Sequence, residues 1–277
     1  MKPYAIGLYE KAMPNTLTIK EKLMTAKECG YDYMELSIDE TDEKLSRLDW
    51  DEQTIRHIKK DMEETGVPIG SICLSGHRKY PLGSAKHQAR SMAIMEKALR
   101  LASRLGIPMI QLAGYDVYYE KGTPETQQRF LKNLKACAVL AARYGICLGF
   151  ETMETPFMDT VWKSMFYVKQ VNSPWLGIYP DTGNLTNAGL LMHADPLLDL
   201  ESGAGHLFAL HLKETVPGKY REIPFGTGHV DFEAMIGCAW KLGVRRYVTE
   251  LWHTDDRWKE AIVAANRMMR TLLDQHD

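Results

Sequence analysis

The sequence predicts one α/β domain folded as a (β/α)8 TIM barrel, with parallel strands at the centre and helices around them. Three observations lead to this fold class. Eight short apolar segments alternate with longer amphipathic segments, and the 277 residues match the length of one such barrel. Several of the apolar segments also end in a side chain that can bind a metal ion, which is where barrels of this kind place their chemistry. We therefore expect residues 1–277 to form a single domain.

The segments expected as strands are short, apolar and bounded by turn residues, as buried parallel strands are. They span residues 4–9, 32–37, 68–74, 107–113, 146–151, 175–180, 205–212 and 246–251. An open doubly wound sheet would also alternate strands and helices. Eight repeats without a GxGxxG motif after the first strand favour the closed barrel, and no Pro-, Gly- or Ser-rich linker divides the chain.

The connecting segments carry residues that begin and end helices. The segment 84–105 spaces its apolar residues three and four apart and ends at Gly106. The next helix is expected to begin near Pro124 and to end before Gly145, and a later one to follow Asp231.

Bulk composition excludes several classes of protein. Hydrophobic residues make up 45% of the chain and the formal net charge is −2, so no general electrostatic attraction to nucleic acid or to a membrane is expected. The five cysteines are odd in number and scattered, which indicates reduced thiols. No signal peptide and no run of 18 apolar residues appears, so we expect a cytoplasmic enzyme that acts on a small molecule.

Four of the expected strands end in a potential metal ligand. The residues are Glu151, Asp181, His211 and Glu250, at spacings of 30, 30 and 39. Barrel strands converge at their carboxyl ends, so three carboxylates and one imidazole would meet there. This donor set suits manganese, magnesium or zinc and lacks the thiolates that select a soft metal. Each residue could instead simply bond a neighbouring loop, but a carboxylate after an apolar run needs a partner to offset its desolvation.

The chain also resembles a known family over most of its length. The similar stretches are GLYEKA (7–12), MELSIDETD (34–42), LSRLDW (45–50), CLSGHRKYPLG (73–83), QLAGYDVYY (111–119), YPDTGNL (179–185) and IPFGTGHVDF (223–232). They resemble the xylose-isomerase-like TIM barrels, and within them the L-ribulose/L-xylulose 5-phosphate 3-epimerases of L-ascorbate utilisation. The resemblance implies that Glu151, Asp181, His211 and Glu250 bind one divalent metal ion. It also implies that Glu151 and Glu250 are the catalytic acid/base pair. Asn184 stands where related epimerases of unphosphorylated sugars have a histidine near the substrate.

Epimerisation next to a ketone removes a proton from one face of a carbon and returns one to the other face. Two opposed groups serve this inversion, and Glu151 and Glu250 come from strands far enough apart to flank a substrate. A metal bound to the C2 carbonyl and C3 hydroxyl oxygens would stabilise the cis-enediolate. The resemblance implies that the substrate is a phosphorylated ketopentose.

The substrate's phosphate needs basic partners. One candidate is Lys213, in the loop after the seventh strand. His77 and Arg78 follow the third strand, with Ser75 nearby. Lys11 and Arg47 are further candidates that are supported mainly by the resemblance. The cluster at His77 and Arg78 could instead be a solvated surface patch. Glu154 could support the site or merely belong to a loop.

Three other functions compete with an epimerase. An aldose–ketose isomerase uses the same metal and enediolate but moves the proton between C1 and C2. A non-catalytic sugar-phosphate binding barrel would be expected to lack one of the paired acids. An apurinic endonuclease needs more histidine ligands and a basic groove than a chain with nine histidines and a net charge of −2 supplies. Apolar and aromatic helix faces, together with the family, favour a homodimer.

Overall fold

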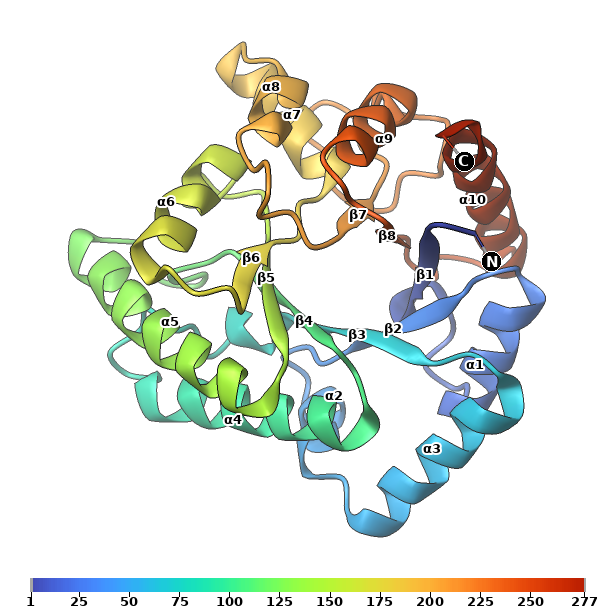
Figure 1. Ribbon diagram of the computed structural model, residues 1–277, viewed down its shortest axis with the longest axis horizontal. Helices are drawn as coiled ribbons and strands as arrows, with labels where there is room; N and C mark the ends of the chain where they lie inside the picture. Colours follow the sequence, from blue (N-terminus) through green and yellow to red (C-terminus); the bar gives the residue numbers. More distant parts are fainter. Residues whose placement is uncertain (1, 277) are drawn as a thin grey trace.

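A computed structural model describes residues 2–276 and shows a barrel of parallel strands surrounded by helices, which confirms the predicted fold class (Figure 1). The strands are β1 (Ala5–Tyr9), β2 (Tyr33–Ser37), β3 (Ile69–Leu74), β4 (Met109–Ala113), β5 (Cys147–Glu151), β6 (Leu176–Ile178), β7 (Leu210–Leu212) and β8 (Arg246–Thr249). They pair in the order β6-β5-β4-β3-β2-β1-β8-β7. Isolated parallel bridges from Ile178 to Leu207 and from Asp181 to His211 connect the two outer strands.

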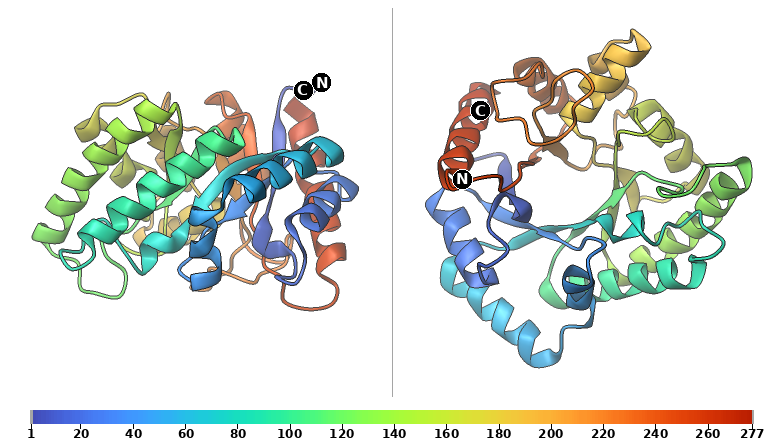
Figure 2. Two further views of the ribbon diagram at one scale, coloured as in Figure 1. Left: turned by 90° about the horizontal axis from the view of Figure 1, so that it is seen from below. Right: turned by 180° about the vertical axis from the view of Figure 1, so that it is seen from behind.

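Helices lie on the outside of the barrel, as the side view in Figure 2 shows. The longer ones are α1 (Ile19–Glu28), α3 (Glu52–Thr65), α4 (Gln88–Leu105), α5 (Pro124–Tyr144), α6 (Val161–Val171), α7 (Thr182–Met192), α9 (Phe232–Lys241) and α10 (Trp258–Leu273). The short ones are α2 (Asp42–Ser46) and α8 (Pro196–Glu201), with the 3-10 turns η1 (Glu10–Ala12), η2 (Arg47–Asp49), η3 (Ser75–Arg78) and η4 (Asp274–His276). None of the helices in the described part of the chain is both long and apolar enough to cross a bilayer.

The predicted helix boundaries are mostly confirmed. Helix α4 ends at Gly106 and α5 ends at Gly145, whose φ angles of 74° and 67° favour glycine. Helix α5 begins at Pro124 as predicted, with Thr123 as its N-cap. Helix α4 begins at Gln88 rather than at 84, because the residues before it form turns. The strands predicted at 175–180 and 205–212 are shorter in the structure; Pro180 has no amide hydrogen to extend the first.

Aromatic side chains help to fill the barrel's interior. The buried ring of Tyr33 lies where a Cβ atom on Gly7 or Gly70 would be, 2.3 and 2.4 Å from the nearest ring atoms. The hydroxyl of Tyr33 donates to the backbone carbonyl of Tyr247, 2.8 Å away on β8. Glycines on β1 and β3 therefore make the room that this tyrosine needs.

A buried carboxylate joins the elements around the carboxyl end of β1. Glu10 is buried, and its oxygens accept hydrogen bonds from Lys22 on α1 at 2.7 Å, Lys44 on α2 at 2.8 Å and Arg47 on η2 at 2.6 Å. Burial alone would raise the pKa of Glu10, but Arg47, Lys22 and Lys44 hold this pKa well below its usual range. Three buried cations therefore share one buried carboxylate, which links α1, α2 and η2 to the end of β1.

Replacing Glu10 by Gln should destabilise the fold strongly, because three buried cations would lose their counter-charge. We expect the free energy of unfolding to fall by about 3–5 kcal/mol, the usual cost of removing one partner from a buried ion pair. Urea denaturation at pH 7 measures this change. The control is Glu64→Gln, which removes the exposed partner of Lys20 and should have little effect.

The contribution of Glu10 also depends on pH in a defined direction. Since its folded-state pKa is lowered, the stabilisation is present above the ordinary carboxyl pKa and is lost as the pH falls toward the folded value. Wild type should therefore approach the Glu10→Gln variant in stability under acid conditions. A difference between the two that stays constant from neutral pH into strong acid would contradict the assignment.

Candidate metal and catalytic site

Four strands bring the predicted ligands to one point. Glu151 is the last residue of β5, Asp181 caps the N-terminus of α7, His211 lies within β7, and Glu250 directly follows β8. All four are buried, and each offers one ligand atom within 4.8 Å of the others. The predicted convergence at the carboxyl end of the barrel is thus present in the geometry.

Asp181 leaves one oxygen free in this cluster. Its Oδ1 accepts from the amide of Asn184 at 2.7 Å and lies 3.1 Å from the ammonium of Lys213. Its Oδ2 is buried and has no hydrogen-bond partner among residues 2–276. Burial raises the pKa of Asp181 to about 8; Lys213 opposes the rise, and the charges of Glu250 and Glu151 add to it. A buried carboxylate oxygen without a partner lowers the stability of the folded state unless a cation binds it.

His211 is held between two carboxylates. Its Nε2 lies 2.7 Å from Glu35 Oε1, and its Nδ1 lies 3.0 Å from Glu250 Oε2. Burial alone would lower the pKa of His211, but the charges of Glu35 and Glu250 raise it well above its usual value. In the neutral ring, a proton on Nε2 donates to Glu35 and leaves the lone pair of Nδ1 directed at the cluster.

Glu35 also contacts the cluster, although the sequence did not identify it as a site residue. It lies on β2 and is buried; besides His211, its Oε2 accepts from Ser71 Oγ at 2.7 Å and from the Tyr179 hydroxyl at 3.1 Å. Its signal in the sequence is a lone acid in the middle of an otherwise apolar or small strand. Gln111 on β4 was missed in the same way, and its side-chain amide donates to Glu151 Oε2.

Lys213 lies within the cluster itself. Its ammonium is 2.9 Å from Asn184 Oδ1 and 3.7 Å from Glu250 Oε2, in addition to its contact with Asp181. Burial alone would lower the pKa of Lys213, but Asp181 and Glu250 raise it, so this lysine is a fixed cation. For Glu250 the effects are reversed: burial alone would raise its pKa, but the positive charges of Lys213 and His211 lower it.

The residues of this cluster fit a divalent cation. The cluster contains the four buried carboxylates of Glu35, Glu151, Asp181 and Glu250 but only one ammonium, that of Lys213. The imidazole of His211 adds a nitrogen that could bind a metal ion at the same point. A bound cation would offset the remaining charge and occupy the free oxygen of Asp181.

The other predicted substrate contacts lie on several loops. Lys11 forms an ion pair with Asp39 at 2.7 Å. Arg47 is buried against Glu10 and also donates to the Ser37 carbonyl at 3.2 Å, so its charge already has a partner. His77 is buried, with Nε2 3.0 Å from the Ser91 carbonyl, and burial lowers its pKa to about 4.

The remaining candidates lie around Arg78. Its guanidinium packs over the rings of Tyr118 and Tyr115, at 4.9 and 5.9 Å, and its buried Nε has no hydrogen-bond partner among the described residues. Glu154 accepts from the Tyr115 hydroxyl at 2.7 Å and from Arg221 at 2.8 Å. Ser75 is half-buried at the start of η3, the turn that carries Arg78.

Comparisons with known proteins agree with this geometry. A family model described as "Xylose isomerase-like TIM barrel" matches residues 23–272. The L-ribulose-5-phosphate 3-epimerase UlaE of Escherichia coli O139:H28 is 41% identical over 254 residues, covering 91% of this chain and 88% of that protein. The enzyme of the same name from Shigella sonnei strain Ss046 has the same identity and coverage.

Solved structures of sugar epimerases share the fold. A D-psicose 3-epimerase crystallised with D-fructose superposes with a TM-score of 0.80 at 15% identity, covering 97% of this chain and 99% of that one. An L-ribulose 3-epimerase superposes with a TM-score of 0.78 at 18% identity, covering 98% and 95%. These matches confirm the resemblance seen in the sequence, and the named relatives are enzymes of the isomerase class.

Glu35→Gln should weaken metal binding, because the amide no longer provides the carboxylate that fixes the His211 ring. We expect affinity for Mn²⁺ or Zn²⁺ to fall about 10- to 100-fold, as is usual for such supporting residues. Competition with a chromophoric chelator measures this. The control is Tyr31→Phe. It also removes a buried polar group, but the hydroxyl of Tyr31 bonds Ile262 and Thr249 and not the metal cluster. Equal affinities for wild type and Glu35→Gln would exclude this role for Glu35.

Proposed function

The chain belongs to the xylose isomerase-like TIM barrel family, and from this premise we propose that it is a metal-dependent 3-epimerase that interconverts L-ribulose 5-phosphate and L-xylulose 5-phosphate. The observation that carries the proposal is the 41% identity, over 91% of the chain, to L-ribulose-5-phosphate 3-epimerase UlaE. The cluster of Glu151, Asp181, His211 and Glu250 supplies the chemistry that such a reaction needs.

We propose that these four residues hold one manganese, magnesium or zinc ion. Three carboxylate oxygens and one imidazole nitrogen form a donor set that suits such ions. When bound, the ion supplies Lewis-acid stabilisation of the negative charge that develops when a proton leaves the carbon beside a ketone. Asp181 and His211 are fixed by Asn184, Lys213 and Glu35, so their work is chiefly to hold the ion.

Glu151 and Glu250 are proposed as the pair that exchanges the C3 proton. They come from β5 and the end of β8, on different sides of the mouth. Gln111 donates a hydrogen bond that orients Glu151, while Lys213 and His211 favour the ionised form of Glu250. One carboxylate takes the proton and the other returns one from the opposite face, and their roles reverse in the reverse reaction.

The phosphate group is proposed to bind near Arg78, with Ser75, His77 and Lys11 as neighbours. The guanidinium of Arg78 packs on Tyr115 and Tyr118, and the structure shows no carboxylate partner for it among residues 2–276. A guanidinium held in this way suits a phosphate dianion. Arg47 stays a prediction as a phosphate ligand, since its guanidinium already binds Glu10.

Three further features are proposed for the whole protein. The cysteines are free and mostly buried thiols, which suits a reducing cytoplasm. One large hydrophobic core contains residues from all parts of the described chain, and no second core of comparable size is found among residues 2–276. This supports a single domain over residues 1–277. Exposed apolar side chains support a homodimer.

Purified protein should convert L-ribulose 5-phosphate to L-xylulose 5-phosphate, and a chelator should abolish turnover reversibly. In deuterated solvent, deuterium should enter C3 of the recovered sugar, because the C3 proton exchanges through the two glutamates. Product analysis by NMR tests both points. An aldose phosphate as the product would instead establish an isomerase, and the absence of any turnover with metal-loaded protein would remove the proposed activity.

Glu151→Gln and Glu250→Gln should each lower kcat by about 10³-fold or more at saturating metal, since each removes one proton carrier. Asp181→Asn is the comparison, because it should weaken metal binding while its activity recovers in part as the metal concentration rises. Near wild-type kcat in either Gln variant would rule out the two-base scheme.

Arg78→Ala should raise KM for the phosphorylated ketopentose about 10- to 100-fold, the loss expected for a charge-assisted phosphate contact. The value for the unphosphorylated sugar should change little. Steady-state kinetics with both sugars measure the difference. Lys79→Ala is the matched control, because Lys79 is the exposed neighbour of Arg78. An unchanged KM in Arg78→Ala would remove Arg78 from the phosphate site.

A further inference from the structure

A buried ammonium lies among the proposed metal ligands, where its positive charge opposes the binding of another cation. Lys213 is only 3% exposed. Its Nζ lies 3.1 Å from Asp181 Oδ1 and 3.7 Å from Glu250 Oε2, and it donates to Asn184 Oδ1 at 2.9 Å. A bound metal ion would itself favour the ionised form of Glu250, so the loaded protein does not need the lysine for that purpose.

The backbone of Lys213 is fixed against the start of α7. The hydroxyl of Thr182 accepts a hydrogen bond from the backbone amide of Lys213 at 3.0 Å and donates to its carbonyl at 3.1 Å. Gly183 comes so close that a Cβ atom there would lie 2.9 Å from the same carbonyl oxygen. The backbone of the lysine therefore cannot shift away from the cluster without moving the helix whose N-cap is Asp181.

The two groups that bind the ammonium are held as well. Asn184 donates through Nδ2 to the Thr152 carbonyl at 2.6 Å, which leaves its Oδ1 directed at Lys213. The backbone amide of Asp181 donates to Thr152 Oγ1 at 3.0 Å, and Asp181 Oδ1 accepts from the amide of Asn184 at 2.7 Å. We therefore expect the charge of Lys213 to stay beside the cluster when a metal ion binds.

We propose that Lys213 is a resident cation that keeps the site folded without a metal and weakens, through its charge, the binding of a divalent ion. Without a metal the buried carboxylates repel one another, and the ammonium offsets part of that repulsion. With a metal bound, the ammonium and the ion are like charges in a buried site, where repulsion is strong. The same four ligands without the lysine would therefore hold an ion more tightly. This inference rests on the proposed metal site.

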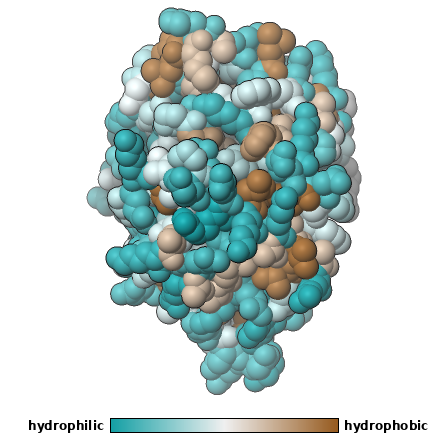
Figure 3. Space-filling view, turned by 90° about the vertical axis from the view of Figure 1, so that its left-hand side faces the viewer, coloured by the Kyte–Doolittle hydropathy of each residue, from teal (hydrophilic) through white to brown (hydrophobic). Residues whose placement is uncertain are grey.

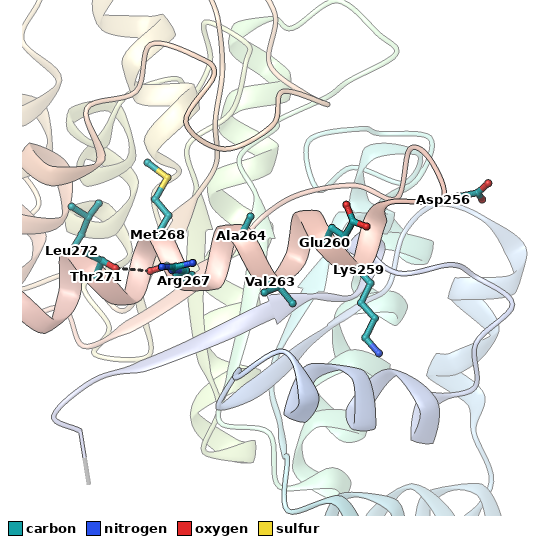
Figure 4. Close-up of a pocket in the computed structure, with 9 residues that line it drawn as sticks. All are labelled: Asp256, Lys259, Glu260, Val263, Ala264, Arg267, Met268, Thr271 and Leu272. Atoms are coloured by element: carbon teal, nitrogen blue, oxygen red, sulfur yellow. Dashed lines mark hydrogen bonds between the residues drawn. The ribbon is translucent and has the colours of Figure 1, made fainter.

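The outer surface of the described chain offers weaker candidates for a ligand site. Figure 3 shows apolar side chains scattered among polar ones on the side of the molecule that carries α5. A shallow hollow of about 910 Å³ lies along the outer face of α10, and Figure 4 shows that Lys259, Glu260 and Arg267 are among its lining residues. These charged side chains are exposed to water, so the hollow has no buried charge there for a ligand to offset.

Isothermal titration calorimetry of chelator-treated protein with Mn²⁺ and with Zn²⁺ tests the proposal. Lys213→Gln keeps a side-chain N–H for Asp181 but removes the charge, so the Kd for each ion should fall about 10- to 100-fold. Since both ions carry the same charge, the two Kd values should fall by a similar factor, whereas a changed set of ligands would alter the preference between them. An unchanged or higher Kd, or a fall for one ion only, would overturn the proposal.

The matched control is Lys22→Gln. Lys22 is also a buried lysine, and it donates to Glu10 at 2.7 Å, outside the cluster of metal ligands. This variant should lose stability but keep the wild-type Kd for both ions. An equal fall in Kd for Lys22→Gln would overturn the assignment to Lys213, because it would indicate a general effect of removing positive charge.

Stability without metal gives a second readout. Wild type stripped with EDTA should keep the near-UV circular dichroism of the loaded protein. Stripped Lys213→Gln should have a lower Tm and a larger rise in Tm on saturation with Mn²⁺, and a variant that folds only with metal present is the extreme form of this result. Unfolding of stripped wild type at room temperature would overturn the proposal without any variant.

Failure of this inference and failure of the proposed metal site can be told apart. A wild-type protein that binds neither ion would remove the metal site and the inference with it. A measurable wild-type Kd that Lys213→Gln leaves unchanged would remove the inference alone, and the epimerase assay would be unaffected.

Discussion

The arrangement of the barrel's mouth depends on the cost of burying negative charge. Glu35, Glu151, Asp181 and Glu250 are all buried at one point, and a buried carboxylate without a partner costs several kcal/mol. Lys213 offsets part of this charge, and hydrogen bonds from side chains such as Ser71 and Gln111 offset another part. A cation among these oxygens would offset the remaining charge, which is the main physical support for the proposed metal site.

The scaffold fixes each ligand through elements that are distant in the sequence. Asp181 is both a metal-site residue and the N-cap of α7, so the start of that helix sets its position. Glu35 reaches His211 from β2, a strand that does not pair with β7. Tyr179 donates to the same carboxylate from the end of β6. Rigid strands rather than mobile loops therefore set the ligand positions, which favours a pre-organised site.

The sequence predicted much of the fold and the four residues that meet at the barrel's mouth, because each is encoded locally. A strand ending in Glu151 or a helix ending before Gly106 can be read from a few neighbouring residues. Glu35, Gln111 and Glu10 could not be assigned in this way, since their partners lie on other strands or helices and only the closed barrel brings them together. The same reason explains why the contact between Lys213 and Asp181 could not be predicted from the sequence.

Charge at the mouth is divided between two sectors, and this division bears on the substrate. The four proposed metal ligands lie at the ends of β5 to β8, whereas Arg78 follows β3. A ligand with a ketone at one end and an anionic group at the other could place the ketone at the proposed cation and the anionic group at Arg78. Lys213 is engaged by Asp181 and Asn184, so its ammonium is not free to serve a phosphate after β7. Arg78 after β3, which has no carboxylate partner among residues 2–276, is therefore a better match than Lys213 for the phosphate of the proposed substrate.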